Sequence, residues 1–428
     1  MLHELRDRRS LHLLITKLAV FFTSFELIRP FEFLLTLSDM LFMLAFVMMI
    51  AIGRIPRHPY GTATTIFLAL FSLMILSMVI SSFIGGGADR AAAFVIQYAF
   101  AYVVLAYILA AEDYAEVVAL VRWYLAGLAI GLLITFYWFW FEPTPNYFVS
   151  GNGRLMGWKN GANGQAVIIA LSLPLLYCLW LRKQWPLMLL IPVSLILAYG
   201  LIATSSNSGL MAAIFGALLF FVMTITFGRA IKAIVVMAVV ASLVASFGLD
   251  YLPQIFQDRV LTAVESGNLD EAGTFSDRVD LIVEALDLID DTIFLGLGAD
   301  QFRHHSASGL PVHSTYLLLW TEGGLICMIG WVGMIITIAM LGLTILRTAD
   351  GGIQGATAIA ISATVLVVAI GSTHLYARTY VMPIILALGL VISTQRMLAY
   401  ARAPLRTHPR PAAQQPVAEE QLLSGDLQ

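Results

Sequence analysis

Charged side chains are scarce in this sequence. Asp, Glu, Lys and Arg make up 12% of the 428 residues, whereas hydrophobic residues make up 59%. Soluble globular domains carry about a quarter charged residues, so this composition excludes a soluble enzyme or a soluble binding domain. Inside lipid, a backbone satisfies its own hydrogen bonds by forming helices. We therefore predict an all-α fold, a polytopic transmembrane helical bundle.

Cysteine is also scarce. The two cysteines, Cys178 and Cys327, both lie inside apolar runs. This pattern argues against a disulfide framework and against a cysteine-based metal site. The acidic residues of the polar segment 250–312 lack the spacing of calcium ligands. We therefore expect no metal, and we also expect no cofactor. Residues 1–10 form a short charged leader, and the apolar run after it lacks the cleavage site of a signal peptide.

Long apolar runs recur along the chain. A helix that crosses a membrane needs about 20 mostly apolar residues. By this criterion we predict about twelve spans, at residues 11–29, 32–53, 62–84, 93–111, 121–141, 167–181, 186–203, 209–227, 233–249, 323–346, 354–370 and 381–397. Residues 1–397 would form one transmembrane domain. The polar, proline-containing segment 398–428 would be a disordered tail.

Lysine and arginine gather in alternate turns between the predicted spans. One set of turns carries Arg54, Arg57, Arg122, Arg182, Lys183, Arg229, Lys232 and Arg347. Basic residues favour the cytoplasmic side of a membrane. We therefore expect a multi-pass protein of the bacterial inner membrane with both termini in the cytoplasm. The loops 142–166 and 250–312 should then face the periplasm.

Polar side chains concentrate in the first of these loops and in a serine-rich turn. Arg154 and Lys159 stand in a glycine-rich stretch, where cations and backbone N–H groups could contact a phosphate. An ordinary solvated loop would have the same composition. Asn207 and Ser208, in the turn 204–209, could bind a polar ligand or could cap the next helix.

The long loop holds two further candidates. Arg278 stands near the start of a predicted helix, where a cation opposes the helix dipole. Anion binding would explain this position, and so would a pair with a neighbouring carboxylate. His313 begins an apolar stretch and could act as a general base or as a helix cap. His304 and His305 lack a carboxylate or cysteine partner at the spacing of a zinc site.

The order of these motifs resembles the O-antigen ligase and polysaccharide polymerase family of bacterial integral-membrane glycosyltransferases. The resemblance spans roughly residues 150–380. It is carried by the loop with Arg154, Gly157 and Asn163, by the turn ending Ser208-Gly209, by Arg278 followed by Gly296-Leu-Gly-Ala-Asp-Gln-Phe, and by His313-Ser-Thr-Tyr-Leu followed by Glu322-Gly-Gly. Arg378, before the last span, matches a further basic position.

The resemblance implies an enzyme that works on the periplasmic face without a nucleotide sugar or a metal. The donor would be a glycan linked to undecaprenyl pyrophosphate. The acceptor would be a hydroxyl of the lipid A core, as in lipopolysaccharide, or of another repeat unit, as in exopolysaccharide biosynthesis. The resemblance assigns acceptor activation to His313 and pyrophosphate binding to Arg278.

Other candidate residues also follow from the resemblance. Arg154, Lys159 and Arg378 are further candidate contacts for the pyrophosphate, and Ser208 and Tyr316 are candidate substrate contacts. One position departs from the family, because its members commonly carry arginine where this chain has Asn207. Either a neighbouring cation compensates or the substrate geometry differs, which favours a polymerase slightly over a ligase.

Two other classes fit a polytopic membrane protein. A transporter or flippase for a polysaccharide or a lipid-linked glycan would carry ionisable residues in the middle of its spans, and Asp39 is the main such residue here. A peptidoglycan-type polymerase would share the donor class, but its usual loop acid is not identifiable. The concentration of polar residues in the periplasmic loops favours the glycosyltransferase.

Overall fold

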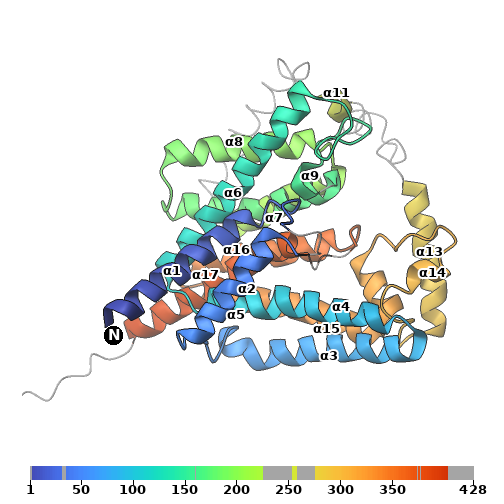
Figure 1. Cartoon of the computed structure of the whole chain (residues 1–428), viewed down its shortest axis with the longest axis horizontal. Coiled ribbons are helices and arrows are strands. Elements are labelled where there is room, and N and C mark those ends of the chain that lie inside the picture. The colour runs from blue at the N-terminus through green and yellow to red at the C-terminus, as the bar shows by residue number, and fades with distance from the viewer. Residues whose placement is uncertain are drawn as a thin grey trace, which may run out of the picture.

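The chain folds as a bundle of helices. The computed structural model describes residues 2–30, 35–159, 161–224, 253–257, 275–373, 375 and 377–402. Within these residues, paired extended backbone is confined to an isolated antiparallel bridge between Val149 and Leu155. Figure 1 shows most helices packed side by side, with α13 (Phe275–Asp291) and α14 (Phe302–His305) at one edge. The predicted all-α polytopic bundle is confirmed.

Seven helical segments are long and apolar enough to cross a membrane. They are η1 and α3 (Gly61–Gly85), α4 to α5 (Ala88–Ala110), α6 (Tyr114–Phe141), α7 (Ala162–Leu181), α9 (Asn207–Thr224), α15 (Thr315–Leu346) and most of α17 (Arg378–Arg402). Three shorter apolar helices coincide with further predicted spans: α2 (Leu37–Ala51), α8 (Leu187–Ala203) and α16 (Gly352–Val368). The predicted span 233–249 and tail residues 403–428 lie outside the described residues. The number of twelve and the disorder of residues 403–428 therefore stay predictions. Residues 398–402, which we expected in the tail, instead continue α17.

The first helix differs from the prediction at both ends. α1 (Leu2–Phe22) includes the segment that we expected to be a separate leader, and it ends at Phe22 rather than near residue 29. Two charged residues of this helix find partners on α6 or at its start. Arg9 donates to Asp113 at 3.0 Å, and Lys17 lies 2.9 Å from Glu116. These ion pairs explain how a charged segment can join the bundle.

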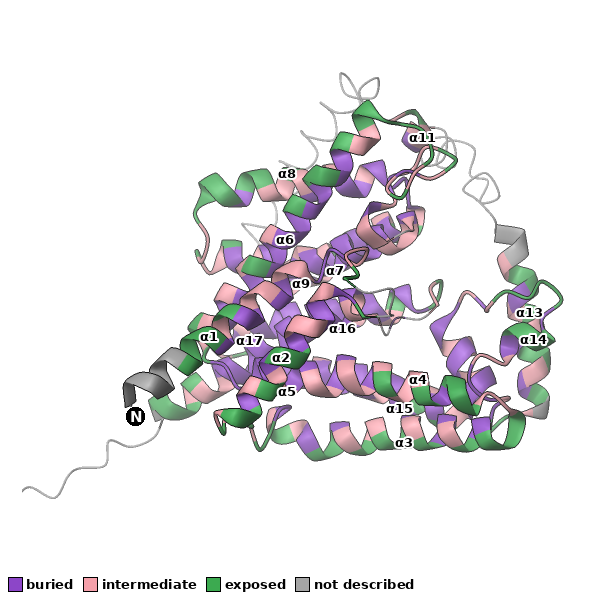
Figure 2. Ribbon diagram, in the orientation of Figure 1, coloured by how far each residue is buried: buried purple, intermediate pink, exposed green. Residues whose placement is uncertain are grey.

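The centre of the bundle and its outer faces differ in burial. Most of the apolar stretch of α17 and of α7 is buried, whereas most of the corresponding stretches of α3 and α9 is not (Figure 2). Large apolar side chains remain exposed on these outer helices, including Phe83, Leu218 and Met211. A soluble protein rarely exposes so much apolar surface. This surface is what a helix needs on the side that contacts lipid.

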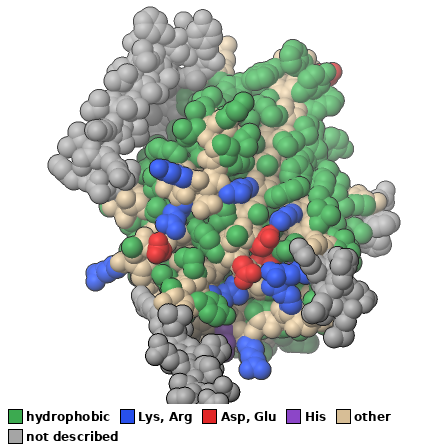
Figure 3. Space-filling model, turned by 90° about the vertical axis from the view of Figure 1, so that its left-hand side faces the viewer, with side chains coloured by type: hydrophobic (Ala, Val, Ile, Leu, Met, Phe, Trp, Pro, Cys, Tyr) green, Lys and Arg blue, Asp and Glu red, His purple; other side chains and the backbone are tan. Residues whose placement is uncertain are grey.

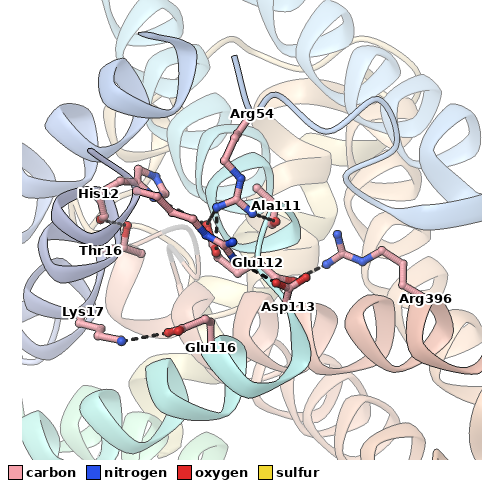
Figure 4. A network of polar contacts seen from close by, with 10 residues as sticks. His12, Thr16, Lys17, Arg54, Ala111, Glu112, Asp113, Glu116 and Arg396 are labelled. Atoms are coloured by element: carbon pink, nitrogen blue, oxygen red, sulfur yellow. Dashed lines mark hydrogen bonds and ion pairs between the residues drawn. The ribbon is translucent and has the colours of Figure 1, made fainter. Parts of the chain in front are cut away.

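Charged groups gather at the end of the bundle that carries the N-terminus (Figure 3). Glu112, in the turn between α5 and α6, is fully buried there. Both of its carboxylate oxygens lie 3.4 Å from Nη1 of Arg54, and His12 Nδ1 lies 3.6 Å from one of them (Figure 4). Arg396 donates to the backbone carbonyl of Glu112. The network therefore connects three segments to Glu112: α1, α17 and the turn that follows α2.

This network joins segments that the basic-residue pattern assigns to the same side of the membrane. Arg54 and Arg396 come from the turn after α2 and from the end of α17. Arg122 donates to the side-chain oxygen of Gln184 at 3.3 Å, which joins two more of the predicted cytoplasmic segments. The grouping agrees with the predicted alternation of turns. The assignment of this end to the cytoplasm stays a prediction.

Candidate functional site

Arg154 fixes the loop after α6 to the serine-rich turn. Its Nε donates to the backbone carbonyl of Thr204 at 2.9 Å, and its Nη2 donates to Oδ1 of Asn163 at 2.6 Å. Leu155 N also donates to the carbonyl of Ala203. A cation at the C-terminus of a helix is favourable, and Thr204 directly follows α8. The structure thus places Arg154 beside the turn that carries Asn207, where it holds two helices together.

The serine-rich turn begins a helix. Ser206 Oγ accepts a hydrogen bond from the backbone N–H of Gly209 at 3.2 Å, as an N-cap does. The capping interpretation of this turn is therefore confirmed for Ser206. Asn207 and Ser208 occupy the first two positions of α9, where Asn207 is half-buried and Ser208 is exposed. Both side chains remain available as candidate contacts for a polar ligand.

Lys159 forms a partly buried ion pair. Its Nζ lies 2.8 Å and 2.9 Å from the two carboxylate oxygens of Glu26, and it stands 4.7 Å from the ring centre of Tyr380. Burial lowers the pKa of Lys159, the carboxylate of Glu26 opposes this effect, and the charge of Arg378 adds to it. Lys159 and Arg378 therefore act within one electrostatic environment, although they are far apart in the sequence.

Arg378 also has an acidic partner. It forms an ion pair with Asp39, which is almost fully buried, and its guanidinium carbon lies 5.9 Å from the ring centre of Phe100. Asp39 sits in the first turn of α2, where it forms a capping box with Thr36. The expectation of a mid-span acid at Asp39 is therefore wrong, because this carboxylate serves a helix start. The position of Asp39 at a helix start weakens the main sequence argument for a transporter.

Arg278 and His313 come together at the edge formed by α13. An apolar cluster of Leu281, Ala285, Phe302, Val312 and Leu318 packs α13 against the start of α15. This packing brings Arg278, in the first turn of α13, into the environment of His313, which precedes α15.

The protonation state of His313 follows from that environment. Burial lowers the pKa of His313, and the positive charge of Arg278 lowers it further. A neutral imidazole can accept a proton. The capping alternative for His313 is wrong, because the N-cap of α15 is Ser314, whose side chain accepts from Leu317 N at 3.5 Å.

Tyr316 points toward the neighbouring helix. Its hydroxyl donates to the backbone carbonyl of Leu366 in α16 at 2.6 Å, and its ring packs edge-on against Trp331. A buried tyrosine hydroxyl needs such a partner. The contacts give Tyr316 a role in positioning the start of α15.

The glycine motifs meet at a break in α15. Gly324 has φ 81° and ψ 171°, so the helix is interrupted there and carbonyls before it are released. Leu297 N and Gly298 N donate to the carbonyls of Thr321 and Glu322, both at 2.8 Å. A Cβ atom on Gly296 would lie 2.3 Å from the carbonyl carbon of Glu322. The segment 296–298 therefore completes the hydrogen bonding of the broken helix.

A small cavity lies beside this break, and sequence reasoning did not identify it. Its volume is about 240 Å³. It lies between α4, the segment 299–303 and the start of α15, and its polar lining consists of Arg90, Gln97, Tyr98, Asp300, Arg303, Thr315 and Glu322. Glu322 was visible only as part of the glycine motif. The close approach of Arg90, 3.6 Å from Asp300, has no local sequence signal.

The candidate residues thus form three groups in the described part of the chain. Arg154 joins the turn with Asn207 and Ser208, Lys159 shares an environment with Arg378, and Arg278 lies with His313. Figure 1 shows α13 well apart from the loop between α6 and α7, which carries the first group. Among the described residues, no three His, Cys, Asp or Glu side chains converge as metal ligands.

Comparison with known proteins gives one family. The sequence model of the O-antigen ligase family matches residues 192–332. This range includes the serine-rich turn, α13, the glycine segment and the break in α15, and therefore also Asn207, Ser208, Arg278, His313 and Tyr316. Arg154, Lys159 and Arg378 lie outside it. A search of curated proteins gave no match.

Proposed function

We propose that the chain, whose residues 192–332 match the sequence model of the O-antigen ligase family, transfers a glycan from undecaprenyl pyrophosphate to an acceptor hydroxyl. The observation that carries this proposal is the packing of α13 on the start of α15, which places Arg278 near enough to His313 for its charge to lower the pKa of the imidazole. One group can stabilise a leaving pyrophosphate and the other can accept a proton. Glycan transfer from a lipid pyrophosphate needs both.

In the proposed reaction, the acceptor hydroxyl attacks the anomeric carbon of the donor sugar. The bond between that carbon and the pyrophosphate oxygen breaks, and the electron pair leaves with undecaprenyl pyrophosphate. His313 accepts the hydroxyl proton. The guanidinium of Arg278 binds the pyrophosphate through two parallel hydrogen bonds, and such fixed charge lowers the barrier most where water is excluded.

The lowered pKa of His313 gives this role a definite pH dependence. The imidazole is neutral, and able to accept a proton, above its pKa. Activity should therefore be lost as the pH falls through that value. Because Arg278 contributes to the lowering, its removal should move this loss of activity to higher pH.

The remaining cations rank below Arg278 as pyrophosphate contacts. Lys159 and Arg378 each hold a carboxylate, Glu26 and Asp39. An incoming pyrophosphate would have to displace these partners. Arg154 lies beside Asn207, so it is the cation that can compensate for the arginine common at that position. Asn207 and Ser208 would then contact the substrate, whereas Tyr316 positions α15.

We place the reaction on the periplasmic face of the inner membrane, with both termini in the cytoplasm. The candidate residues lie in turns and helix starts that alternate with the basic turns of the opposite side. A polyprenyl chain would stay in lipid beside the exposed apolar helix faces. The acceptor is a growing glycan or a lipid A core, and Asn207 favours the glycan and hence a polymerase.

A reconstitution experiment separates this function from transport. The purified chain would be placed in liposomes with an undecaprenyl-pyrophosphate-linked glycan whose sugar is fluorescent. Glycosyl transfer yields undecaprenyl pyrophosphate and a longer or newly linked glycan. A flippase would move the intact lipid-linked glycan to the opposite leaflet and release no pyrophosphate. Translocation without release would overturn the proposed function.

A further inference from the structure

The cavity beside the break in α15 has the composition of a sugar-binding site. One wall is aromatic, because the rings of Phe94 and Tyr98 stack with their centres 4.2 Å apart and both line the cavity. Aromatic faces pack well against the C–H faces of pyranose rings. The amide of Gln97 lies on the same helix and can donate and accept hydrogen bonds.

The charged groups of the cavity are paired with one another. Arg303 Nε lies 2.7 Å from one carboxylate oxygen of Asp300, and Arg90 Nε lies 3.6 Å from the other. Glu322, only 7% exposed, adds a second carboxyl group. Both guanidinium groups are therefore already paired with the Asp300 carboxylate, which an incoming pyrophosphate would have to displace. Paired charges with fixed orientation suit the hydroxyl groups of a sugar, since each hydroxyl donates and accepts.

The backbone at Asp300 adopts an uncommon conformation beside the cavity. Asp300 has φ 61°, a left-handed conformation that is uncommon for a residue other than glycine. Such strain concentrates at ligand-binding sites. The Asp300 carboxylate lies between two arginines, and the backbone N–H groups of Asp300 and Phe302 face the carboxyl group of Glu322.

The size and position of the cavity limit the class of ligand that it can bind. Its 240 Å³ is below the about 300–1,000 Å³ typical of pockets for drug-sized ligands, so it suits one sugar residue and excludes a polyprenyl chain. Thr315, two positions after His313, belongs to its lining. Resting on the proposed function, we propose that this cavity binds the terminal sugar residue of the acceptor and presents its hydroxyl toward His313.

Binding can be measured without activity. The full chain in nanodiscs would be titrated with methyl glycosides of glucose, galactose, rhamnose and N-acetylglucosamine, followed by saturation-transfer difference NMR. At least one glycoside should bind. Gln97→Ala and Asp300→Asn should each weaken it by about tenfold or more, as expected for lost hydrogen bonds to a charged or amide group. Gln395→Ala is the matched control, because Gln395 lines a separate cavity with Arg57 and Arg396 and should leave binding unchanged.

The same titration with undecaprenyl pyrophosphate in the nanodisc identifies the subsite. An acceptor site predicts that this lipid does not displace the glycoside. Displacement would assign the cavity to the donor and overturn the proposal. Absence of glycoside binding, or binding that Gln97→Ala leaves unchanged, would overturn it as well.

The experiments distinguish a folding defect, failure of the proposed function and failure of the acceptor site. Gln97→Ala decides the outcome if Asp300→Asn lowers the melting temperature. If glycosides bind as described but the liposome assay shows no transfer, the proposed function has failed and the acceptor role fails with it. If transfer occurs without glycoside binding, the acceptor site alone has failed.

Discussion

The break in α15 should depend on Gly324. A Cβ atom there would lie 2.0 Å from the carbonyl oxygen of Phe294 and 2.5 Å from its carbonyl carbon, and both are backbone atoms that cannot turn aside. The φ of 81° adds a conformational cost of about 1–2 kcal/mol. Overpacking adds about 1–3 kcal/mol. Gly324→Ala should therefore destabilise the fold by about 2–5 kcal/mol.

A matched control isolates the steric part of this effect. Gly53 has φ 72°, close to that of Gly324, but a Cβ atom there would meet nothing within 4 Å. Gly53→Ala should therefore cost only the conformational part, about 1–2 kcal/mol.

The two buried cysteines, Cys178 and Cys327, supply the assay. A thiol-reactive dye reports unfolding when heat exposes them. The Gly324 variant should melt several degrees below the Gly53 variant. Equal melting temperatures would refute the account of the broken helix.

Three further predictions concern topology and the site. Reporter fusions after Lys183 and after Gly309 should give opposite localisation signals, and matching signals would contradict the predicted orientation. Glu26→Gln removes the carboxylate that opposes the lowering of the Lys159 pKa, so that pKa should fall further. Lys159 would then lose its positive charge at a lower pH, so the decline of transfer on the alkaline side should begin at a lower pH than in the wild type. An unchanged pH profile would argue against Lys159 as a pyrophosphate contact. Because the proposed charge stabilisation comes from arginine, transfer should continue in excess chelator. Loss of transfer that magnesium or calcium restores would refute this.

The helices could be predicted because they depend on local composition. Long apolar runs with a basic turn at alternate ends specify spans such as 62–84 and 121–141, which match α3 and α6. The start of α1 was missed because its charged residues pair with residues far away in the sequence, such as Asp113 at the start of α6. No window of the sequence contains both members of that pair.

The candidate site was only partly predictable for the same reason. His313 and Arg278 were identifiable because they stand in an ordered motif. The partners of Lys159 and Arg378 were not, because Glu26 and Asp39 lie far away in the sequence. Asp39 in particular looked like an acid in the middle of a span. Only the capping box with Thr36 shows that it begins a helix.

The cavity with Glu322 depends on backbone conformations that sequence patterns do not reveal. Gly324 and Asp300 both adopt positive φ, and only the first is a glycine. The break at Gly324 turns the start of α15 so that Glu322 faces the segment 299–303. The apolar run 323–346 predicts a span that begins next to this break, and the sequence gives no sign of the cavity beside it.

The most direct test of the proposed chemistry compares the wild type with His313→Asn. Asparagine keeps a polar group at this position but cannot accept a proton near neutral pH, and Ser314 continues to cap α15 in either protein. The rate of undecaprenyl pyrophosphate release would be measured in liposomes with a fixed amount of lipid-linked glycan. Loss of a general base lowers a rate by about a hundred- to ten-thousand-fold, and we expect a loss in this range with an unchanged melting temperature. Release at the wild-type rate by His313→Asn would contradict proton transfer at His313 and, with it, the proposed mechanism.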